Sequence, residues 1–369
     1  MTKPTTKFAP EEWAACAAML GVMAAGLWQA AIALGSPAIQ EIPITLADFR
    51  EGRVTGAVST QLDKNLPIRN ELIAWANAGR YVLTHGAGDQ VRLGLDDWLF
   101  SVEELQYFDE VRTHQNARIA VLAKAAMALK AQGVTLIVAP VPDKARIYPQ
   151  HLPTGLYPHW HADRYGFILE TLRAQGVAVA DLLPALTPKN EESPLYYRTD
   201  THWNQHGAQL AAVAVAERVK AVAADLPPTS FETGPTGPLV QRPGDLLRMM
   251  GLSDMPNWAR PTPDMEISVH TRKSGTAQPA GLFDNVGVPV VLIGTSYSLR
   301  ANFHGHFQQA LGAEVLNVSR DGGGFIQSAK DYFADESFKS AKPQVIVWEV
   351  PERVFSAPLS DPEKQALSL

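Results

Sequence analysis

Cysteine is almost absent from this sequence of 369 residues, since Cys16 is the only one. A single thiol forms no intrachain disulfide and no Cys-based metal site, and its place in an apolar stretch marks it as a small apolar residue. The chain also lacks a strong charge imbalance: its formal net charge is −6, and no run of five like charges occurs. A nucleic-acid partner and an acidic or basic tail are therefore not expected.

The longest uncharged stretch near the N-terminus covers residues 13–34 and follows Lys3 and Lys7. Its length matches the roughly 20 apolar residues that cross a bilayer. The preceding lysines predict that the N-terminus lies in the cytoplasm and the rest of the chain outside it. We therefore expect residues 1–40 to hold a single-pass inner-membrane anchor, with the remainder in the periplasm. A cleaved signal peptide is the alternative, because Ala33-Leu34-Gly35 offers small residues at a suitable position.

From about residue 91 onward, short apolar runs alternate with helical stretches. Residues 134–141 form a near-continuous apolar run, as in a strand covered on both faces. Residues 111–132 carry apolar residues at helical spacing and stop at Gly133. Further strands are expected at 177–182, 288–293, 313–318 and 344–350, and further helices at 206–224, 300–311 and 326–333. This alternation predicts an α/β fold with a mostly parallel sheet and helices on both faces.

The domain organisation follows from the same patterns. Residues 41–90 resemble a helical lead-in, and residues 91–369 are expected to form one α/β domain. Within that domain, residues 227–284 are rich in Pro, Gly and Thr and show no persistent period. Because this segment is too long for a plain connection, we expect an irregular insertion near the functional site.

One serine lies in the setting that a nucleophile requires. The buried run at 290–293 ends at Gly294, and Ser296 follows two residues later, before a helical stretch. A strand–turn–helix of this kind exposes the hydroxyl and brings backbone amides close enough to hold an oxyanion. Serine is also a common helix N-cap, so a structural role is the alternative, and Ser298 is a weaker second candidate.

Asp200 and His202 are two residues apart at the end of an extended stretch, where their side chains project to the same side. An aspartate beside a histidine fixes the tautomer and stabilises the imidazolium that forms when the ring accepts a proton. Metal ligation is the competing use of such a pair. No metal is expected, because His206 is the only other nearby ligand and no neighbouring carboxylate completes a site.

A third segment, residues 318–325, also joins a strand end to a helix, and it contains Arg320 and Gly322-Gly323-Gly324. Glycines allow backbone N–H groups to approach a substrate closely or to form an anion-binding nest. The Lys-Ser/Thr pair of a phosphate loop is missing, so phosphate binding is not expected. A flexible turn is the alternative interpretation.

Taken together, these segments resemble the alginate O-acetyltransferase family, the AlgJ/AlgX-type SGNH hydrolase-like proteins. The segments that carry the resemblance occur in one order: 91–94 leading to 97–100, 140–148, 199–203, 294–298 and 348–353. The resemblance implies a three-layer SGNH hydrolase-like domain with a permuted order of catalytic residues, because the Asp-x-His precedes the serine. We expect the AlgJ-like branch, since the chain leaves no room before Leu369 for the C-terminal carbohydrate-binding module of the AlgX-like branch.

Carried over by position, the resemblance implies that Ser296 is the nucleophile, His202 the base and Asp200 the residue that orients the base. No match is found for the oxyanion asparagine of ordinary SGNH enzymes. We expect backbone amides at Ser296 and around Gly323 to take its place. The further candidates for oxyanion or substrate binding are Gly294, Tyr297, Arg320 and Trp203.

The activity implied by the resemblance is a two-step transfer of acetyl groups, through an acetyl-serine, to hydroxyls of an exported polysaccharide. The family acts with a membrane-bound O-acyltransferase that brings acetyl groups across the inner membrane, and no cofactor is implied. The overall charge and the tryptophans at 160, 203 and 258 favour a neutral glucan such as cellulose over alginate as acceptor. Packing in the core is the alternative, and commoner, role of each tryptophan. A carbohydrate acetyl esterase with the same triad and a non-catalytic polysaccharide-binding scaffold are the alternatives.

Overall fold

The computed structural model describes residues 10–35, 45–65, 68–190, 193–274 and 287–367. The chain divides into two compact units, residues 1–79 and residues 80–369. The first unit contains α1 (Pro10–Leu34), α3 (Leu46–Arg50), α4 (Arg53–Asn65) and the larger part of α5 (Arg69–Thr84). Of these helices, α3, α4 and α5 lie within residues 41–90, where the sequence predicts a helical lead-in.

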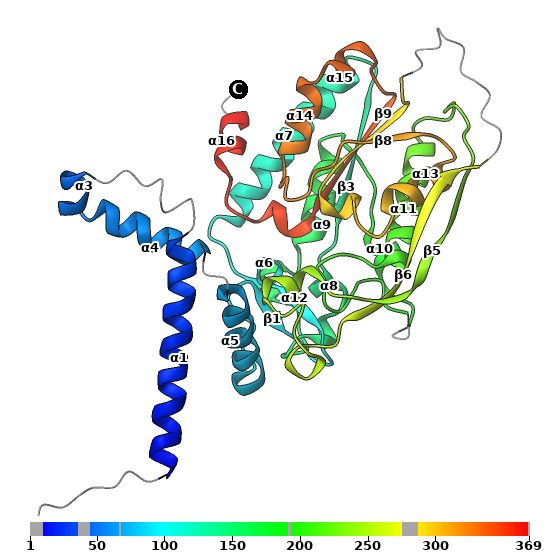
Figure 1. The fold of residues 1–369 in the computed structure, drawn as a ribbon. Coiled ribbons are helices and arrows are strands. Elements are labelled where there is room, and N and C mark those ends of the chain that lie inside the picture. Colours follow the sequence, from blue (N-terminus) through cyan, green and yellow to red (C-terminus); the bar gives the residue numbers. More distant parts are fainter. Residues whose placement is uncertain (1–9, 36–44, 66–67, 191–192, 275–286, 368–369) are drawn as a thin grey trace, which may run out of the picture. The chain divides into compact units, whose positions relative to one another are not determined.

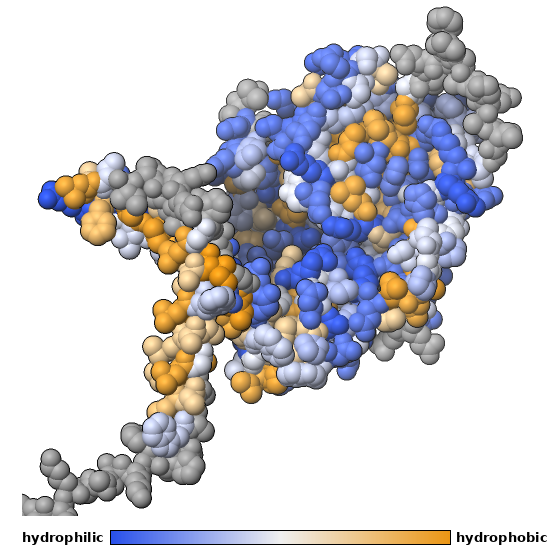
Figure 2. Space-filling view, in the orientation of Figure 1, coloured by the Kyte–Doolittle hydropathy of each residue, from blue (hydrophilic) through white to orange (hydrophobic). Residues whose placement is uncertain are grey.

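Helix α1 covers the stretch in which a membrane anchor is predicted. It exposes large apolar side chains such as Met19, Leu20 and Leu27. Figure 2 shows hydrophobic residues in orange along this helix. Its commonest residue, however, is the weakly apolar alanine. Among the described residues, no helix combines the length and the apolar character needed to cross a membrane. The transmembrane helix is therefore not confirmed by the structure.

A five-stranded sheet lies at the centre of the second unit (Figure 1). In spatial order, its strands are β4 (Ala178–Val179), β3 (Thr135–Val141), β9 (Val345–Pro351), β7 (Val290–Ile293) and β8 (Val315–Asn317). Every neighbouring pair runs in parallel, which confirms the predicted parallel sheet. Parallel strands present their carboxyl ends at one edge, so the segments that follow β3, β7 and β9 meet there.

Helices cover both faces of this sheet, which gives the expected three layers. Alternate strand residues point to opposite faces. Leu292 and Val347 belong to one apolar cluster, whereas Val291 and Ile346 belong to the other. The first cluster includes α11 (Gln205–Lys220) and α13 (Phe303–Leu311), and the second includes α7 (Val111–Lys130), α9 (Arg164–Ala174) and α14 (Gln327–Ala334).

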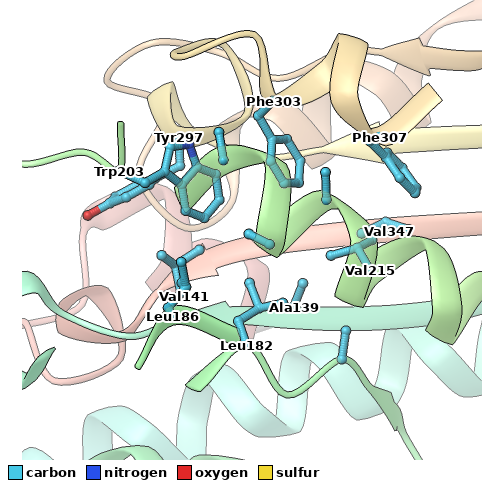
Figure 3. Packing of buried hydrophobic residues seen from close by; sticks show 14 of the residues in the cluster. Ala139, Val141, Leu182, Leu186, Trp203, Val215, Tyr297, Phe303, Phe307 and Val347 are labelled. Atoms are coloured by element: carbon cyan, nitrogen blue, oxygen red, sulfur yellow. The ribbon is translucent and has the colours of Figure 1, made fainter. Parts of the chain in front are cut away.

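Aromatic side chains fill much of the first cluster (Figure 3). Trp203 stacks on Phe303 with ring centroids 4.8 Å apart, and Phe303 lies 6.2 Å from Phe307. Tyr297 meets Trp203 edge to face. Each large apolar side chain that is fully buried contributes roughly 1.5–3 kcal/mol, so this row fixes the segments before α11 and α13 firmly to the sheet.

The segment expected to be irregular is more regular than its sequence indicates. β5 (Phe231–Arg242) pairs in antiparallel register with β6 (Asp264–Lys273), and α12 (Asp245–Met249) and η3 (Asn257–Ala259) lie between them. Much of β5 is exposed, so the apolar alternation that reveals a half-buried strand is missing. The pairing is also interrupted by an irregularity between Pro235 and Leu239. Residues 275–284 of the expected insertion lie outside the described residues.

Shorter elements complete the second unit. β1 (Val91–Leu93) pairs with β2 (Leu99–Ser101) in antiparallel register. The remaining helices are α6 (Val102–Leu105), α8 (Lys144–Ile147), η1 (Pro149–His151), η2 (His159–His161), α10 (Leu183–Leu186), η4 (Ser296–Ser298), α15 (Glu336–Ser340), η5 (Glu352–Phe355) and α16 (Asp361–Leu367). Both α8 and η5 begin just beyond a strand end, next to the turn that carries Ser296.

Candidate active site

The turn after β7 presents Ser296 at the first position of η4. Thr295 caps this short helix, and its hydroxyl accepts a hydrogen bond from the N–H of Tyr297. A glycine is needed at 294, because a Cβ there would lie 2.4 Å from the Ser298 hydroxyl oxygen and 2.6 Å from a Glu349 carboxylate oxygen. Gly294 therefore shapes the turn rather than contacting a substrate.

A buried carboxylate on the neighbouring strand β9 stabilises this turn by hydrogen bonds. Glu349 of β9 accepts hydrogen bonds from the Thr295 N–H at 2.7 Å and from the Ser298 hydroxyl at 2.9 Å. Burial raises the pKa of Glu349, against the opposing effect of these hydrogen bonds. Ser298, the weaker nucleophile candidate, is fully buried and bonded to this carboxylate. It therefore serves the architecture of the turn.

The structure brings Ser296, His202 and Asp200 into one chain of hydrogen bonds. The Ser296 hydroxyl lies 2.7 Å from His202 Nε2, and His202 Nδ1 lies 2.6 Å from Asp200 Oδ1. Because Nδ1 faces a carboxylate, it carries the proton, which leaves Nε2 as the acceptor of the serine proton. Ser296 is half-buried, whereas His202 and Asp200 are buried. This is the arrangement that activates a serine hydroxyl for nucleophilic attack.

The loop that carries Asp200 and His202 is closed and held at several points. An isolated bridge between Tyr196 and Trp203 closes it. Lys144 of α8 is fully buried and donates hydrogen bonds to the carbonyls of Arg198 and Asp200, each at 2.8 Å. Burial lowers the pKa of Lys144 to about 8, against the raising effect of nearby carboxylates. These contacts fix the loop whose position sets the geometry of the base.

Opposing effects set the charge states of the Asp–His pair. Burial disfavours ionised Asp200, but the hydrogen bond and charge of His202 and the neighbouring Arg242 outweigh it and hold the pKa of Asp200 well below its usual range. Burial likewise disfavours the imidazolium of His202. Hydrogen bonds to Asp200 and Asp245 and their negative charges outweigh that penalty and raise the pKa of His202. Asp200 is therefore ionised at neutral pH and stabilises the protonated ring.

Sequence reasoning missed two residues of this site, Arg242 and Asp245. Arg242 donates a hydrogen bond to Asp200 Oδ2 at 2.8 Å, and Asp245 Oδ2 lies 3.4 Å from His202 Nδ1. Arg242 ends β5 and Asp245 begins α12, more than 35 positions along the chain, where no sequence pattern marks them. The expectation that no carboxylate completes a metal site beside His202 is therefore wrong.

Asp200, His202 and Asp245 are grouped closely enough to hold a cation. Two contacts favour a different use of the group. His202 Nδ1 must carry a proton to bond with Asp200, and a protonated nitrogen has no lone pair for a metal. The guanidinium of Arg242 already lies against the second oxygen of Asp200. The cluster is thus arranged for holding a proton on His202.

Two of the expected substrate-binding residues are core residues. Trp203 is 0% exposed and is packed between Tyr297 and Phe303, so its ring cannot stack on a sugar. Tyr297 is also 0% exposed, and its hydroxyl donates a hydrogen bond to the Thr201 carbonyl at 2.7 Å. Trp203 and Tyr297 therefore stabilise the loop of His202 and the turn of Ser296 from within the core.

The Gly-rich loop lies beside Ser296, but its expected oxyanion donor is engaged. The N–H of Gly323 donates a hydrogen bond to the Arg320 carbonyl at 3.2 Å. Arg320 projects an exposed side chain that pairs with Asp331 at 2.9 Å. The backbone N–H groups of Ser296 and Gly322 make no hydrogen bond to any described residue. These two groups are consequently the better candidates for contacting a developing negative charge.

Ser296 stands where two hollows of the second unit meet. One has a volume of about 990 Å³ and is lined by the Gly-rich loop, and the other has a volume of about 740 Å³ and is lined by His202 and Asp245. The residues common to both are Glu103, Gln106, Ser296, Asp321, Gly322 and Arg353. Neither Trp160 nor Trp258 lines these hollows. A ligand can therefore approach the serine from two sides.

Comparison with known proteins agrees with this architecture. Residues 91–352 match a family described as SGNH hydrolase-like domain, acetyltransferase AlgX. A probable alginate O-acetylase AlgJ from Pseudomonas putida is 34% identical over 310 residues, which are 82% of this chain and 80% of that protein. A protein of the same description from Azotobacter vinelandii is 31% identical over 341 residues, or 90% of this chain and 85% of its own length.

Solved structures give the same result. The O-acetyltransferase domain of Pseudomonas putida AlgJ matches with a TM-score of 0.66 and 31% identity, over 75% of this chain and 98% of that chain. AlgX of Pseudomonas aeruginosa matches with a TM-score of 0.58 and 26% identity, over 71% of this chain and 62% of that chain. The chain belongs to the AlgJ/AlgX family of SGNH hydrolase-like acetyltransferases.

Proposed function

We propose that this protein transfers acetyl groups to hydroxyls of an alginate-type polysaccharide through an acetyl-serine at Ser296. The observation that carries the proposal is the continuous hydrogen-bond chain from Ser296 through His202 to Asp200. A chain of this kind delivers the serine proton to a base whose imidazolium is stabilised by a carboxylate. Membership in a family of acetyltransferases supports acetyl as the group transferred.

The first half-reaction acetylates the serine. Ser296 Oγ attacks the carbonyl carbon of the acetyl donor while its proton passes to His202 Nε2. The tetrahedral intermediate collapses, the bond to the donor's leaving group breaks, and His202 returns the proton to that group. The Ser296 N–H, which is free of other described partners, lies at the start of η4, where it can donate to the oxyanion.

The second half-reaction releases the acetyl group. A sugar hydroxyl gives its proton to His202 and attacks the acetyl-serine carbonyl, and Ser296 regains the proton as its ester bond breaks. Water in place of the sugar would make the protein an esterase with the same residues. The two hollows that meet at Ser296 support transfer, because they leave room for a donor and an acceptor on different sides of the serine.

The acceptor is proposed from the relatives and from one feature of the second hollow. The relatives are described as alginate O-acetylases, which outweighs the expectation of a neutral glucan. Arg248 lines the 740 Å³ hollow and is exposed, and its guanidinium donates a hydrogen bond to the Pro243 carbonyl at 3.3 Å. A guanidinium in this position suits the carboxylate of a uronic acid.

The donor and the cellular location are also proposals. A membrane-bound O-acyltransferase would supply the acetyl group, and the protein would act in the periplasm at the inner membrane. The uncharged stretch at residues 13–34, preceded by Lys3 and Lys7, supports export of the remainder of the chain. Protease added to spheroplasts should digest a domain that lies in the periplasm. Protection of the protein from this digestion would contradict the proposed location.

Turnover of a chromogenic acetyl ester tests the proposed chemistry. Wild type, Ser296→Ala and Ser319→Ala are incubated with the ester, with and without alginate oligosaccharides, and the products are followed by mass. Ser319 is a half-buried serine two residues beyond the end of the adjacent strand β8 and serves as the matched control. We expect acetylated oligosaccharide from wild type and Ser319→Ala only. Full activity of Ser296→Ala would exclude the triad, and ester cleavage without transfer would favour an esterase.

A further inference from the structure

Two aspartates hold the catalytic loop in the same way, one on each side of Asp200. Asp245 accepts hydrogen bonds from the N–H of Thr201 at 2.7 Å and from its hydroxyl at 2.5 Å. Asp264 of β6 accepts hydrogen bonds from the N–H of Thr199 at 2.9 Å and from its hydroxyl at 2.6 Å. Asp264 also accepts a hydrogen bond from the N–H of Arg198 at 2.9 Å. Each carboxylate therefore anchors the loop through the backbone and the hydroxyl of a threonine.

Asp245 and Asp264 differ in their other contacts. Asp245 Oδ2 lies 3.4 Å from His202 Nδ1, and the Asp245 N–H donates a hydrogen bond to Asp200 Oδ2 at 3.1 Å. Its side chain is 15% exposed and lines the 740 Å³ hollow beside Ser296. Asp264 makes no contact with the imidazole within the described residues and interacts instead with Arg198. Only Asp245 is placed to act on the catalytic histidine.

The positive charge nearest to these carboxylates is already shared. Arg242 donates to Asp200 at 2.8 Å and to Glu266 at 2.9 Å, and its guanidinium lies over the ring of Tyr197. It does not pair with Asp245. The negative charge of Asp245 is therefore left for the imidazole that it faces.

The other charged groups around His202 do not replace this contact. Lys144 of α8 binds backbone carbonyls of the loop, and Glu349 of β9 binds the turn of Ser296. Arg353 of η5 approaches the hydroxyl of Tyr297 and Glu103. Each of these groups affects the electric field at His202, but among the residues that the structure describes only Asp200 and Asp245 place carboxylate oxygens beside Nδ1.

We propose that Asp245 is a positioning residue of the reaction: a second carboxylate that holds the Nδ1–H of His202 and stabilises the imidazolium formed when Ser296 is deprotonated. The inference rests on the proposed function for its catalytic meaning. Its physical content, the interaction of Asp245 with a protonated His202, can be measured without any turnover.

A histidine titration by NMR tests the inference on the full-length protein. The imidazole resonances of wild type, Asp245→Asn and Asp264→Asn are followed against pH, and a His202→Ala spectrum identifies the His202 signals. Asparagine keeps an oxygen that can accept from the threonine, so both variants lose the same charge from the same loop. We expect Asp245→Asn to lower the pKa of His202 by about one unit. Asp264→Asn should leave it close to the wild-type value.

A second variant shifts the same equilibrium in the opposite direction. Thr201→Val removes the hydroxyl that donates to Asp245 Oδ2 and that lies 3.2 Å from His202 Nδ1. Asp245 Oδ2 then loses a competing donor, and the protonated imidazole is the donor that remains beside it. We expect the pKa of His202 to rise. An unchanged pKa in both Asp245→Asn and Thr201→Val would overturn the inference. So would an equal fall in Asp245→Asn and Asp264→Asn, which would indicate a general effect of loop charge.

Kinetics separate this inference from the proposed function. In Asp245→Asn, the acid limb of kcat/KM for the acetyl ester should move to lower pH by the shift seen in the titration. A carboxylate that only anchors the loop would lower kcat without moving the limb. Activity in Ser296→Ala would refute the proposed function, while the NMR shift would still decide the role of Asp245.

Discussion

At the scale of single residues, burial and the neighbouring carboxylates together determine the protonation state of His202. Burial alone would keep the ring neutral, yet two carboxylates within 3.4 Å of Nδ1 favour the protonated form. A base that holds its proton too weakly would not deprotonate Ser296, and one that holds it too strongly would not return the proton. The carboxylates raise the pKa of His202 and so strengthen it as the acceptor of the serine proton.

This balance predicts the pH dependence of ester turnover. His202 accepts the serine proton only when its Nε2 is unprotonated, so activity is present above the pKa of the ring and is lost as the pH falls through it. Because that pKa is raised above 6.5, the acid limb of kcat/KM should have its midpoint above pH 6.5. The measurement is kcat/KM between pH 5 and 9, with Ser296→Ala subtracted as background. A midpoint below 6.5 would contradict the geometry of the Asp–His pair.

At the scale of elements, the segment between β5 and α12 is pressed against the catalytic loop. A Cβ at Gly244 would lie 2.0 Å from the Thr199 carbonyl oxygen and 2.6 Å from the Asp200 backbone nitrogen. Both are backbone atoms that cannot move without displacing Asp200. The tight approach is what brings Arg242 and Asp245 to the Asp–His pair.

Gly244→Ala should therefore lower both the free energy of unfolding and kcat for the acetyl ester, because the added methyl pushes the loop away from Ser296. Gly166→Ala is the matched control. Gly166 is exposed in α9 with nothing within 4 Å of its Cβ position, so alanine there should stabilise the helix by roughly 0.5–1 kcal/mol. Urea denaturation and ester kinetics of the two variants test this. If the two variants have the same free energy of unfolding and the same kcat, the close approach of Gly244 to the Thr199 carbonyl is unimportant.

Beyond the carboxyl ends of β3 and β9, charged residues form a buried network. Glu352 accepts hydrogen bonds from Arg164 at 2.9 Å and from Arg146, and Arg164 also pairs with Asp143. Although burial opposes ionisation of Glu352, the two arginines outweigh it and lower the pKa of this carboxyl. The network therefore ties α9 and α8 to the strand ends next to the Ser296 turn.

Removing one partner leaves buried charge without compensation. Glu352→Ala should lower the free energy of unfolding by about 3–5 kcal/mol, since Arg146 and Arg164 remain in the interior. Glu336→Ala, which breaks an exposed pair with Lys339, should leave it unchanged within error. Urea denaturation followed by circular dichroism measures both. A small effect of Glu352→Ala would mean that water or rearranged side chains replace the carboxylate.

At the scale of the whole molecule, the sequence predicts the parallel sheet and the Ser296 turn because both depend on local patterns. Apolar runs mark β3, β7 and β9, and Gly294 marks the end of β7. Arg242 and Asp245 could not be found in this way, since their role depends on a contact between segments more than 35 residues apart. Sequence alone also does not show whether an aromatic ring faces solvent or the core. Trp203 was therefore assigned to substrate binding, although it is buried.

The division into two units leads to a prediction about the activity of the second unit, residues 80–369, on its own. Both apolar clusters begin at Trp98 or later, and the residues that line the two hollows run from Asp89 to Glu363. The triad and the side chains that contact it lie in the second unit. A chain of residues 80–369 should therefore fold cooperatively and turn over the acetyl ester with the same kcat/KM as the full chain, within experimental error. Thermal unfolding and ester kinetics of the two proteins test this, with Ser296→Ala in the short chain as background. A folded but inactive short chain would contradict this expectation. If both chains turn over the ester but only the full chain acetylates polymer in cells, residues 1–79 act in a step other than ester turnover.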